Sequence, residues 1–381
     1  MNLNLFATTT FGLEAVVKRE LEKLGVENIR VSDGRVDFTG DFSALARCNI
    51  WLRSADRVMI NFGEFEALSF EELFQGVKAL PWGDFLEKDA KIHVTGKSVR
   101  SQLFSVSDCQ AITKKAIVEK LKQKYAIEWF SEVGAEYKIQ VGILKDTVTI
   151  AIDTTGPGLN KRGYRETAVT APLKETLAHA LIDLSYWNKN RILADTMCGS
   201  GTIPIEAAMV AKNIAPGMSR RFQAEQWPFM NPAVWEDARG EAVAAINSDV
   251  PASIYGSDID PKAIAQAKIN AKLAGVDDIV SFKCHAAADY KPTAEYGVLV
   301  SNPPYGARIG NFDEIKELYA GFRRFMDQNP TWSVYMLTTD EEIEEYLKKR
   351  ATKKRKLFNG NIKTDYYQFI GPRPPRSGLL Y

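Results

Sequence analysis

The stretch from residue 191 to residue 210 joins a short apolar strand, a glycine-rich turn and an apolar helix. Arg191 to Asp195 reads as a buried strand, and the turn that follows carries Gly199 and Gly201. The next residues, 203–210, are typical of a helix that tolerates proline in its first turn. Glycines allow a ligand to approach the backbone closely, and free N–H groups at a helix N-terminus attract a negative group. This order of elements predicts an α/β domain with a nucleotide-cofactor site at the turn.

Two details narrow the ligand of this turn. The turn has only two glycines and does not match the dinucleotide pattern G-x-G-x-x-G, so the charge that it would hold is a small carboxylate instead of a pyrophosphate. A second strand, Ser253 to Asp258, also ends in an acid. Such a carboxylate is placed to accept hydrogen bonds from ribose hydroxyls.

A third strand-like run, Tyr296 to Val300, is followed by Ser301 and then by Asn302-Pro303-Pro304-Tyr305. The two prolines remove backbone donors and stiffen the chain where the strand ends. The Asn302 side chain and the Pro303 carbonyl are acceptors, and Tyr305 offers a flat ring. A planar amino group on a nucleobase needs such a set. An ordinary strand-end turn is the structural alternative, since Asn-Pro is a common turn initiator.

These motifs carry a family resemblance. Residues 195–202, 256–260 and 302–305 look like motifs I, II and IV of class I S-adenosylmethionine (SAM)-dependent methyltransferases, in the form found in enzymes that methylate exocyclic amines of bases. Leu159 to Arg165, followed by Ala171 to Thr176, is similar to the THUMP-domain RNA guanine-N2 methyltransferases, above all the bacterial 23S rRNA enzymes. The resemblance covers nearly the whole chain.

The resemblance implies a C-terminal Rossmann-like seven-stranded methyltransferase sheet, preceded by N-terminal α+β ferredoxin-like and THUMP domains. It implies SAM as the cofactor and the following contacts for it: Arg162, Gly163, Tyr164, Asp195, Met197, Cys198, Gly199, Gly201, Thr202, Asp258, Ile259, Ala286 and Asn302. Catalysis would rest on Asn302, Pro303 and Tyr305. Many relatives carry an acid where this chain has His285, so we expect the contact to adenine there to come from the Ala286 backbone.

We expect three domains: a ferredoxin-like domain over residues 1–56, a THUMP RNA-binding domain over 57–155 and the methyltransferase domain over 156–381. In the second domain, a loop before a helix carries Lys97, Ser98 and Arg100, which suit contacts with RNA phosphates. A polar loop on a generic α/β unit is the structural alternative. Residues 215–234 are an aromatic, proline-containing insertion expected at the carboxyl side of the sheet. We expect most of its rings to fill the core, and one ring could border the base pocket.

Composition sets limits on partners and compartment. With 49 Lys and Arg against 48 Asp and Glu, the net charge of +1 requires any RNA binding to come from local patches. The four cysteines are scattered and the three histidines isolated, so we expect no metal site and no disulfide framework. No apolar run is long enough to span a bilayer and no signal peptide is apparent, so we expect a cytoplasmic protein without a membrane partner.

Four functions remain open at this point. The leading one is methylation of a guanine N2 amine in 23S rRNA, with RNA or a large-subunit assembly intermediate as the partner. Methylation of guanine N2 in tRNA uses the same motifs. N6-adenine methylation of DNA shares Asn-Pro-Pro-Tyr but leaves the THUMP-like half unexplained. A non-enzymatic RNA-binding scaffold predicts eroded motifs around Asp195 or Asn302, and both are intact.

Overall fold

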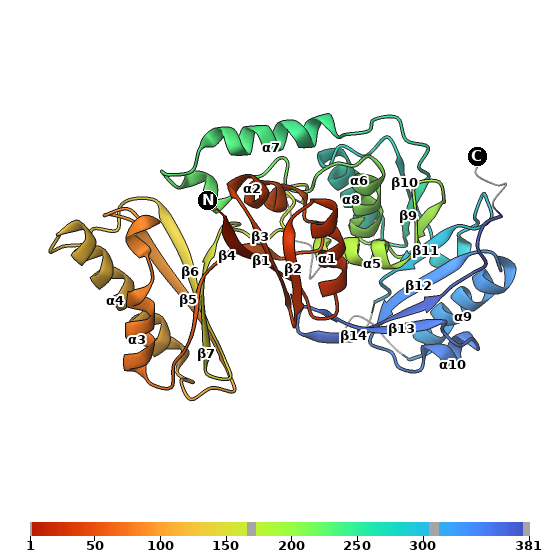
Figure 1. Cartoon of the computed structure of the whole chain (residues 1–381). Coiled ribbons are helices and arrows are strands. Elements are labelled where there is room, and N and C mark those ends of the chain that lie inside the picture. Colours follow the sequence, from red (N-terminus) through yellow and green to blue (C-terminus); the bar gives the residue numbers. More distant parts are fainter. Residues whose placement is uncertain (1, 166–172, 305–311, 376–381) are drawn as a thin grey trace.

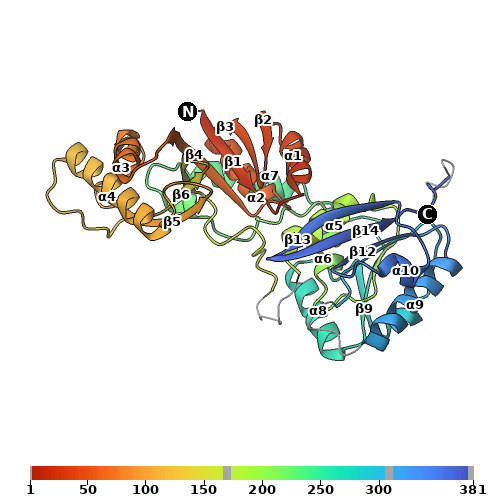
Figure 2. The same ribbon diagram turned by 90° about the horizontal axis from the view of Figure 1, so that it is seen from below.

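The structure is a computed structural model that describes residues 2–165, 173–304 and 312–375. Two seven-stranded sheets lie side by side along the molecule (Figure 1). Seen from below, the helices of residues 70–125 and the methyltransferase-like half stand at opposite ends (Figure 2). None of the helices in the described ranges is long and apolar enough to cross a membrane.

The first sheet is built by the N-terminal 153 residues and has the strand order β2-β3-β1-β4-β7-β6-β5. Its elements are β1 (Leu3–Thr8), α1 (Glu14–Lys23), β2 (Glu27–Ser32), β3 (Arg35–Gly40), α2 (Phe42–Trp51), β4 (Arg57–Glu66), α3 (Phe70–Ala79), η1 (Trp82–Asp84), β5 (Lys91–Val99), α4 (Val106–Tyr125), β6 (Glu136–Leu144) and β7 (Thr147–Asp153). Alternate residues of β6 are buried, the pattern of a strand with one face on a core.

Strand β4 joins the parts that we expected as separate domains. It pairs antiparallel with β1, with Leu5 opposite Ile60, and on its other side with β7, with Met59 opposite Asp153. The boundary expected at residue 57 therefore does not separate two sheets. One hydrophobic core cluster runs beneath the whole sheet. The reason is that β4 completes the strand–helix–hairpin–helix unit and at the same time begins the next one.

The second sheet has the order β10-β9-β8-β11-β12-β14-β13. Its elements are α5 (Glu175–Leu184), β8 (Leu193–Asp195), α6 (Thr202–Ala211), η2 (Gln223–Gln226), α7 (Pro232–Ala244), β9 (Ile254–Asp258), α8 (Pro261–Leu273), β10 (Val280–Cys284), η3 (Ala287–Asp289), β11 (Val298–Ser301), α9 (Phe312–Gln328), β12 (Ser333–Thr338), α10 (Ile343–Leu347), β13 (Lys353–Asn359) and β14 (Ile362–Phe369). The first five strands in the order are parallel, and β14 and β13 close the sheet antiparallel.

Helices cover both faces of this sheet, which is why every residue of β11 and β12 is buried. One core cluster joins the strands to α5, α6 and α8, and another joins them to α9 and α10. The α/β fold expected from the alternation of strands and helices is confirmed, with the expected antiparallel closing pair.

Most rings of the aromatic insertion have the core-filling role that we expected. Phe222 and Trp227 are buried in the core of the first sheet, where Trp227 stacks on Tyr137 with 5.1 Å between ring centroids. Phe229 is partly exposed and lies against Phe85, with 5.1 Å between ring centroids. The Trp227 indole N–H also donates to the Glu136 carbonyl at 3.3 Å. The prediction that one ring borders a base pocket is therefore wrong for these two side chains, because they dock the C-terminal half onto the first sheet.

Helix α7 follows these rings and was not predicted from the sequence. It lies across α2 (Figure 1), where Arg47 makes paired hydrogen bonds of 2.9 and 3.0 Å to Glu241. Its residues Ala233 to Ala244 carry no strong apolar stripe, so periodicity gave a weak signal. The cap was readable, since Asn231 precedes Pro232 and its side chain accepts from the Ala233 N–H at 3.1 Å.

A buried acid on α1 ties the first sheet to the second. One carboxylate oxygen of Glu20 accepts from the backbone N–H groups of Arg53 and Ser54 at 2.8 and 3.2 Å. The other lies 3.3 Å from Nδ1 of His179 on α5, which also meets the Ser54 hydroxyl at 2.7 Å. Burial acts to raise the pKa of Glu20, but the hydrogen bond and charge of His179, with the other bonds, hold the pKa below its ordinary value.

This arrangement predicts an acid-labile junction. Since the folded-state pKa of Glu20 is lowered, its stabilisation is complete above the ordinary glutamate value of about 4.3 and is lost as pH falls through the folded-state pKa. We expect Glu20→Gln to cost about 1–3 kcal/mol of unfolding free energy at pH 7. Melting curves from pH 7 to about pH 3 should show the difference between variant and parent shrinking.

Glu22→Gln is the matched control, because Glu22 sits on the same helix in an exposed pair with Lys18 and should change stability little at any pH. A melting difference between parent and Glu20→Gln that stays constant down to pH 3 would contradict the assignment of the acid-labile contact to Glu20.

Candidate cofactor and base site

The candidate site lies where the strand order of the second sheet reverses. From β8 the chain proceeds outward to β9 and β10, then returns to place β11 on the other side of β8. Ligands of open α/β sheets bind at this point, beyond the carboxyl ends of the strands. Asp195 ends β8 and Ser301 ends β11, and the Ser301 hydroxyl donates to Asp195 Oδ1 at 2.9 Å. The two motifs that are far apart in sequence thus meet.

The glycine turn after β8 is shaped by close packing. Gly201 caps α6 with φ +83°, and a Cβ there would come within 2.9 Å of Phe282 and 3.0 Å of Ala267. A Cβ on Gly256 of β9 would come within 2.5 Å of the same Phe282 ring. Gly199 also has a positive φ of +53°, with open space at its Cβ position. The turn therefore needs glycine for conformation at both positions and for space at Gly201.

Asp258 holds this turn from the neighbouring strand. Its Oδ2 accepts from the Gly199 N–H at 2.8 Å, and its Oδ1 from the Asp260 N–H at 3.0 Å. A carboxylate has about four acceptor positions, so capacity remains for a ligand. The next residue, Ile259, is 74% exposed, an unusual exposure for a large apolar side chain beside a polar edge. Asp258 thus has an acceptor position open for a ribose hydroxyl, and the cofactor contact expected of Ile259 stays a prediction.

Burial raises the pKa of two side chains in the turn. It raises the pKa of Asp195 to about 7, although the Met197 N–H and the Ser301 hydroxyl favour the charged form. Burial, with the nearby charges of Asp195 and Asp258, raises the pKa of the Cys198 thiol well above its ordinary value. Cys198 therefore stays a neutral thiol and is no candidate for a nucleophile. Its predicted place beside the cofactor depends on its backbone and its shape.

A polar cavity of about 250 Å³ opens beside Asp195, on the sheet face near η3. The hydroxyls of Thr196 and Ser257 line it, and both oxygens are buried without a hydrogen-bond partner. Buried polar groups are rarely left unpaired in proteins, so these oxygens indicate space for water or a ligand group.

Asn302 provides the acceptor that the base chemistry requires. Its side-chain oxygen is buried and has no hydrogen-bond partner among the residues that the structure describes, while Pro303 beside it is buried. A buried acceptor without a donor costs free energy unless a ligand supplies one, and an exocyclic amine is such a donor. Tyr305, the predicted stacking residue, lies outside the described residues.

The adenine-binding position is partly as expected. The His285 N–H donates to the Asp258 carbonyl at 3.1 Å, which fixes this loop against the end of β9. The His285 ring turns onto its own chain, with Nδ1 2.9 Å from the Ala286 carbonyl oxygen. The Ala286 carbonyl has two lone pairs, so one acceptor position stays open for an adenine amine, and the expected backbone contact remains a prediction.

The segment before α5 requires a correction. The Arg162 and Tyr164 side chains are almost fully buried, and both bond to Glu206 of α6, at 3.3 and 3.2 Å. Their side chains are therefore structural instead of the predicted cofactor contacts. Gly163, the residue between them, has φ +102° and remains a candidate for a backbone contact to the cofactor. The cation that does reach the site is Arg165, whose Nη2 donates to the Thr202 hydroxyl at 2.6 Å.

Two site residues were missed from the sequence. Ser301 was seen only as a linker to Asn302, and nothing in the sequence pairs it with Asp195. Glu206 had a signal, since it is the one charged residue in the apolar helix from Thr202 to Ala211, and such a residue needs a buried partner.

The predicted RNA-binding residues lie at one end of the first sheet. Lys97 is exposed, but it and Ser98 belong to strand β5, which pairs parallel with β6 as far as Val99. The predicted loop therefore begins only at Arg100, which is exposed and has φ +52°. The Ser98 hydroxyl is buried, so it is not a phosphate donor in this conformation. Lys97 and Arg100 remain candidates.

Within the described ranges, no group of three or more His, Cys, Asp or Glu residues could hold a metal ion. The polar groups of the site are instead acceptors and hydroxyls at a glycine turn.

The strand order, the glycine turn and the buried Asn302 acceptor define a nucleotide-cofactor enzyme of the class I methyltransferase type. Residues 162–368 match the family described as RMKL-like, methyltransferase domain. Residues 4–59 match the RlmL ferredoxin-like domain and residues 67–153 match the THUMP domain. The chain belongs to the RMKL-like methyltransferase family.

Relatives with curated names agree with this class. YpsC of Bacillus subtilis (strain 168), provisionally named an RNA methyltransferase, is 48% identical over 98% of this chain and 97% of its own length. The ribosomal RNA large subunit methyltransferase K/L of Shewanella baltica (strain OS195) is 36% identical over 94% of this chain. The chain spans about half the length of that relative, 52%.

Solved structures share the whole architecture. A protein of Listeria monocytogenes named as a predicted N6-adenine-specific DNA methylase is 50% identical with a TM-score of 0.93, and the match covers 98% of this chain and 97% of that one. A provisionally named methyltransferase, SMU.472, complexed with SAH, is 43% identical with a TM-score of 0.93, over 98% of this chain and 99% of that one.

Proposed function

We propose that this chain transfers the methyl group of SAM to the exocyclic N2 amine of a guanine in 23S rRNA. The observation that carries the proposal is the Asn302 oxygen at the switch point of the sheet, which is buried and has no donor within the described ranges 2–165, 173–304 and 312–375. The names of the K/L relatives and the THUMP match support an RNA substrate over DNA. An rRNA substrate places the reaction in the cytoplasm.

SAM would supply a methyl group already activated by its sulfonium, so the chain needs no covalent nucleophile. Its residues would position the reactants and favour the charge that develops. Gly199, Gly201 and the N-terminus of α6 would receive the carboxylate, and Asp258 the ribose. Asn302 Oδ1 and the Pro303 carbonyl would accept the amine hydrogens, which draws the nitrogen lone pair out of the ring. A base inside a helix cannot reach this site, so we expect an unpaired or flipped guanine.

The experiment is methyl transfer from labelled SAM to separated 23S rRNA, 16S rRNA, tRNA and DNA taken from a strain that lacks this gene, followed by nucleoside analysis. N2-methylguanosine in 23S rRNA is the expected product. The same nucleoside in tRNA would move the substrate to tRNA. N6-methyladenine in DNA, the activity in the name of the Listeria relative, would overturn the assignment of the base.

The RNA-facing end of the first sheet gives a prediction of its own. Replacing Lys97 and Arg100 by alanine should weaken RNA binding and lower the slope of log affinity against log salt by about 1.4–1.8, because each phosphate contact contributes about 0.7–0.9. A salt titration of binding measures both effects. Lys268 and Lys272, exposed on α8, form the matched control with the same loss of charge. An equal slope for parent and Lys97/Arg100 variant would remove this end from the interface.

A further inference from the structure

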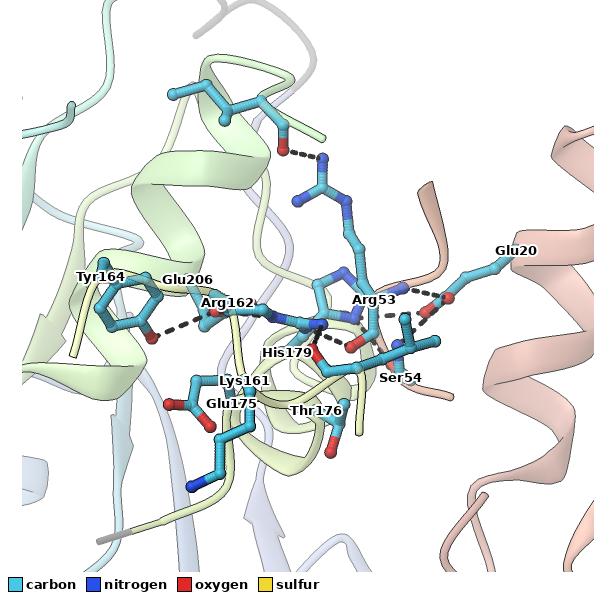
Figure 3. A network of polar contacts seen from close by, with 12 residues as sticks. Glu20, Arg53, Ser54, Lys161, Arg162, Tyr164, Glu175, Thr176, His179 and Glu206 are labelled. Carbon is cyan, nitrogen blue, oxygen red and sulfur yellow. Dashed lines mark hydrogen bonds and ion pairs between the residues drawn. The ribbon is translucent and has the colours of Figure 1, made fainter. Parts of the chain in front are cut away.

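A buried carboxylate on α6 binds the extended stretch of residues 162–164. Glu206 is fully buried, and its two oxygens accept from Arg162 Nε and Nη2, both at 3.3 Å, and from the Tyr164 hydroxyl at 3.2 Å (Figure 3). Each of these donors comes from one extended stretch, residues 162–164. The carboxylate therefore fixes that stretch along the helix.

The next residue of the same stretch, Arg165, contacts the start of α6 beside the glycine turn. Glu206 lies four residues after Thr202, so the two side chains project from one face of α6. Arg165 follows Tyr164 along this face and donates to the Thr202 hydroxyl at 2.6 Å, while its Nη1 lies 2.9 Å from Glu175. Thr202 is the first residue of α6 and directly follows Gly201. The segment thus clamps the helix end that would receive the cofactor.

The same guanidinium reaches the N-terminal sheet. Arg162 donates to the Leu159 carbonyl at 2.8 Å and to the Arg53 carbonyl (Figure 3). Arg53 in turn donates to the Ile214 carbonyl at 2.8 Å, just beyond the end of α6. One buried ion pair therefore holds three pieces in register: the junction after α2, the connecting segment and α6.

A contribution to folding stability is a weak explanation for the presence of this buried ion pair. Burying an ion pair carries a desolvation cost that its attraction roughly offsets, and packed apolar residues of similar volume are often as stable. A buried ion pair with this many directional hydrogen bonds instead fixes the relative orientation of the segments that it joins. The position that it orients most directly is the start of α6.

We propose that Glu206 is a positioning residue: through Tyr164 and Arg162 it sets Arg165 on Thr202 and thereby preorganises the turn for the cofactor. The inference rests on the proposed function only in that SAM binds at this turn, and it does not depend on which base is methylated. Loss of the clamp should weaken cofactor binding while leaving RNA binding and the rate at saturating cofactor nearly unchanged.

The test compares two buried tyrosines. Tyr164→Phe removes only the hydroxyl that donates to Glu206. Tyr366→Phe removes an equally buried hydroxyl in the same domain, which donates to the Leu181 carbonyl at 2.9 Å. The measurements are the dissociation constant for S-adenosylhomocysteine by calorimetry without RNA, the melting temperature, and KM and kcat with rRNA.

We expect Tyr164→Phe to weaken cofactor binding about tenfold and to raise KM for SAM with kcat nearly kept, since a hydrogen bond to a charged group is lost. Tyr366→Phe should leave cofactor binding within about twofold while lowering the melting temperature. Glu206→Gln keeps one acceptor oxygen. We expect its cofactor affinity to lie between those of the parent and of Tyr164→Phe, or below both if the new amide N–H group repels Arg162.

Equal cofactor affinities for the two tyrosine variants would overturn the inference, because both then act only through stability. S-adenosylhomocysteine binding by the parent with any product other than N2-methylguanosine would contradict the proposed function and leave this inference standing. An absence of cofactor binding by the folded parent would overturn both.

Discussion

Asn302→Ala should lower methyl transfer by about 10²–10³-fold, the usual loss when one preorganised polar group is removed from a developing charge. Its side-chain oxygen is buried and meets no donor in the described part of the chain, so an acceptor amine can supply one. Cofactor affinity should stay near that of the parent, because the role lies on the acceptor side. Labelled transfer to rRNA and calorimetry with S-adenosylhomocysteine measure the two quantities.

Two further variants separate the roles at this edge. Asn302→Asp keeps an oxygen acceptor at the same place and should retain more activity than the alanine variant. Asp258→Ala should instead lose cofactor affinity, since its carboxylate both holds the Gly199 N–H and faces the ribose position. An Asn302→Ala variant that loses as much cofactor affinity as Asp258→Ala would contradict the assignment.

Gly201→Ala should cost about 2–5 kcal/mol of unfolding free energy and weaken cofactor binding at least tenfold. A left-handed φ of +83° strains any other residue by about 1–2 kcal/mol, and the new Cβ would press on Phe282 and Ala267, adding about 1–3 kcal/mol. The helix N-terminus that receives the cofactor would have to move. Denaturant unfolding and calorimetry with S-adenosylhomocysteine check both effects.

Gly275→Ala is the control for this substitution. Gly275 ends α8 with φ +68° and has no atom within 4 Å of a Cβ, so it carries the conformational strain alone. It should cost about 1 kcal/mol and leave cofactor binding unchanged. A Gly201→Ala variant no less stable than Gly275→Ala would mean that Phe282 and Ala267 yield without cost.

The sequence was most informative where local chemistry is self-contained. The glycine turn after Asp195 and the acid at Asp258 stand at the ends of two parallel strands. Since parallel strands place their carboxyl ends at one edge of a sheet, the meeting of the turn and the acid could be predicted. Which side chains would turn toward the protein interior could not be predicted from the sequence. Arg162 and Tyr164 look like ligand-binding residues in a basic, aromatic segment, and only the buried Glu206 reveals that they serve the fold.

Long-range packing was the other gap. The aromatic character of Trp227 predicts burial, but nothing local tells that its ring stacks on Tyr137 or that Phe229 lies against Phe85. These partners lie about ninety to a hundred and fifty residues away in sequence. The pairing of β4 on both of its edges was hidden for a similar reason, because strand partners are not encoded locally.

That shared strand has a mechanical consequence. With β4 paired to β1 on one edge and to β7 on the other, the part of the chain that carries Lys97 and Arg100 cannot swing on a hinge independently of the part that packs against α5 and α7. The first sheet thus fixes the position of Arg100 relative to β1 and β4. Asn302 follows β11 of the second sheet, which the contacts of Glu20, Trp227 and Glu241 join to the first. The distance on an RNA between phosphates bound near Arg100 and the modified base should therefore depend on this junction and not on a hinge within the first sheet.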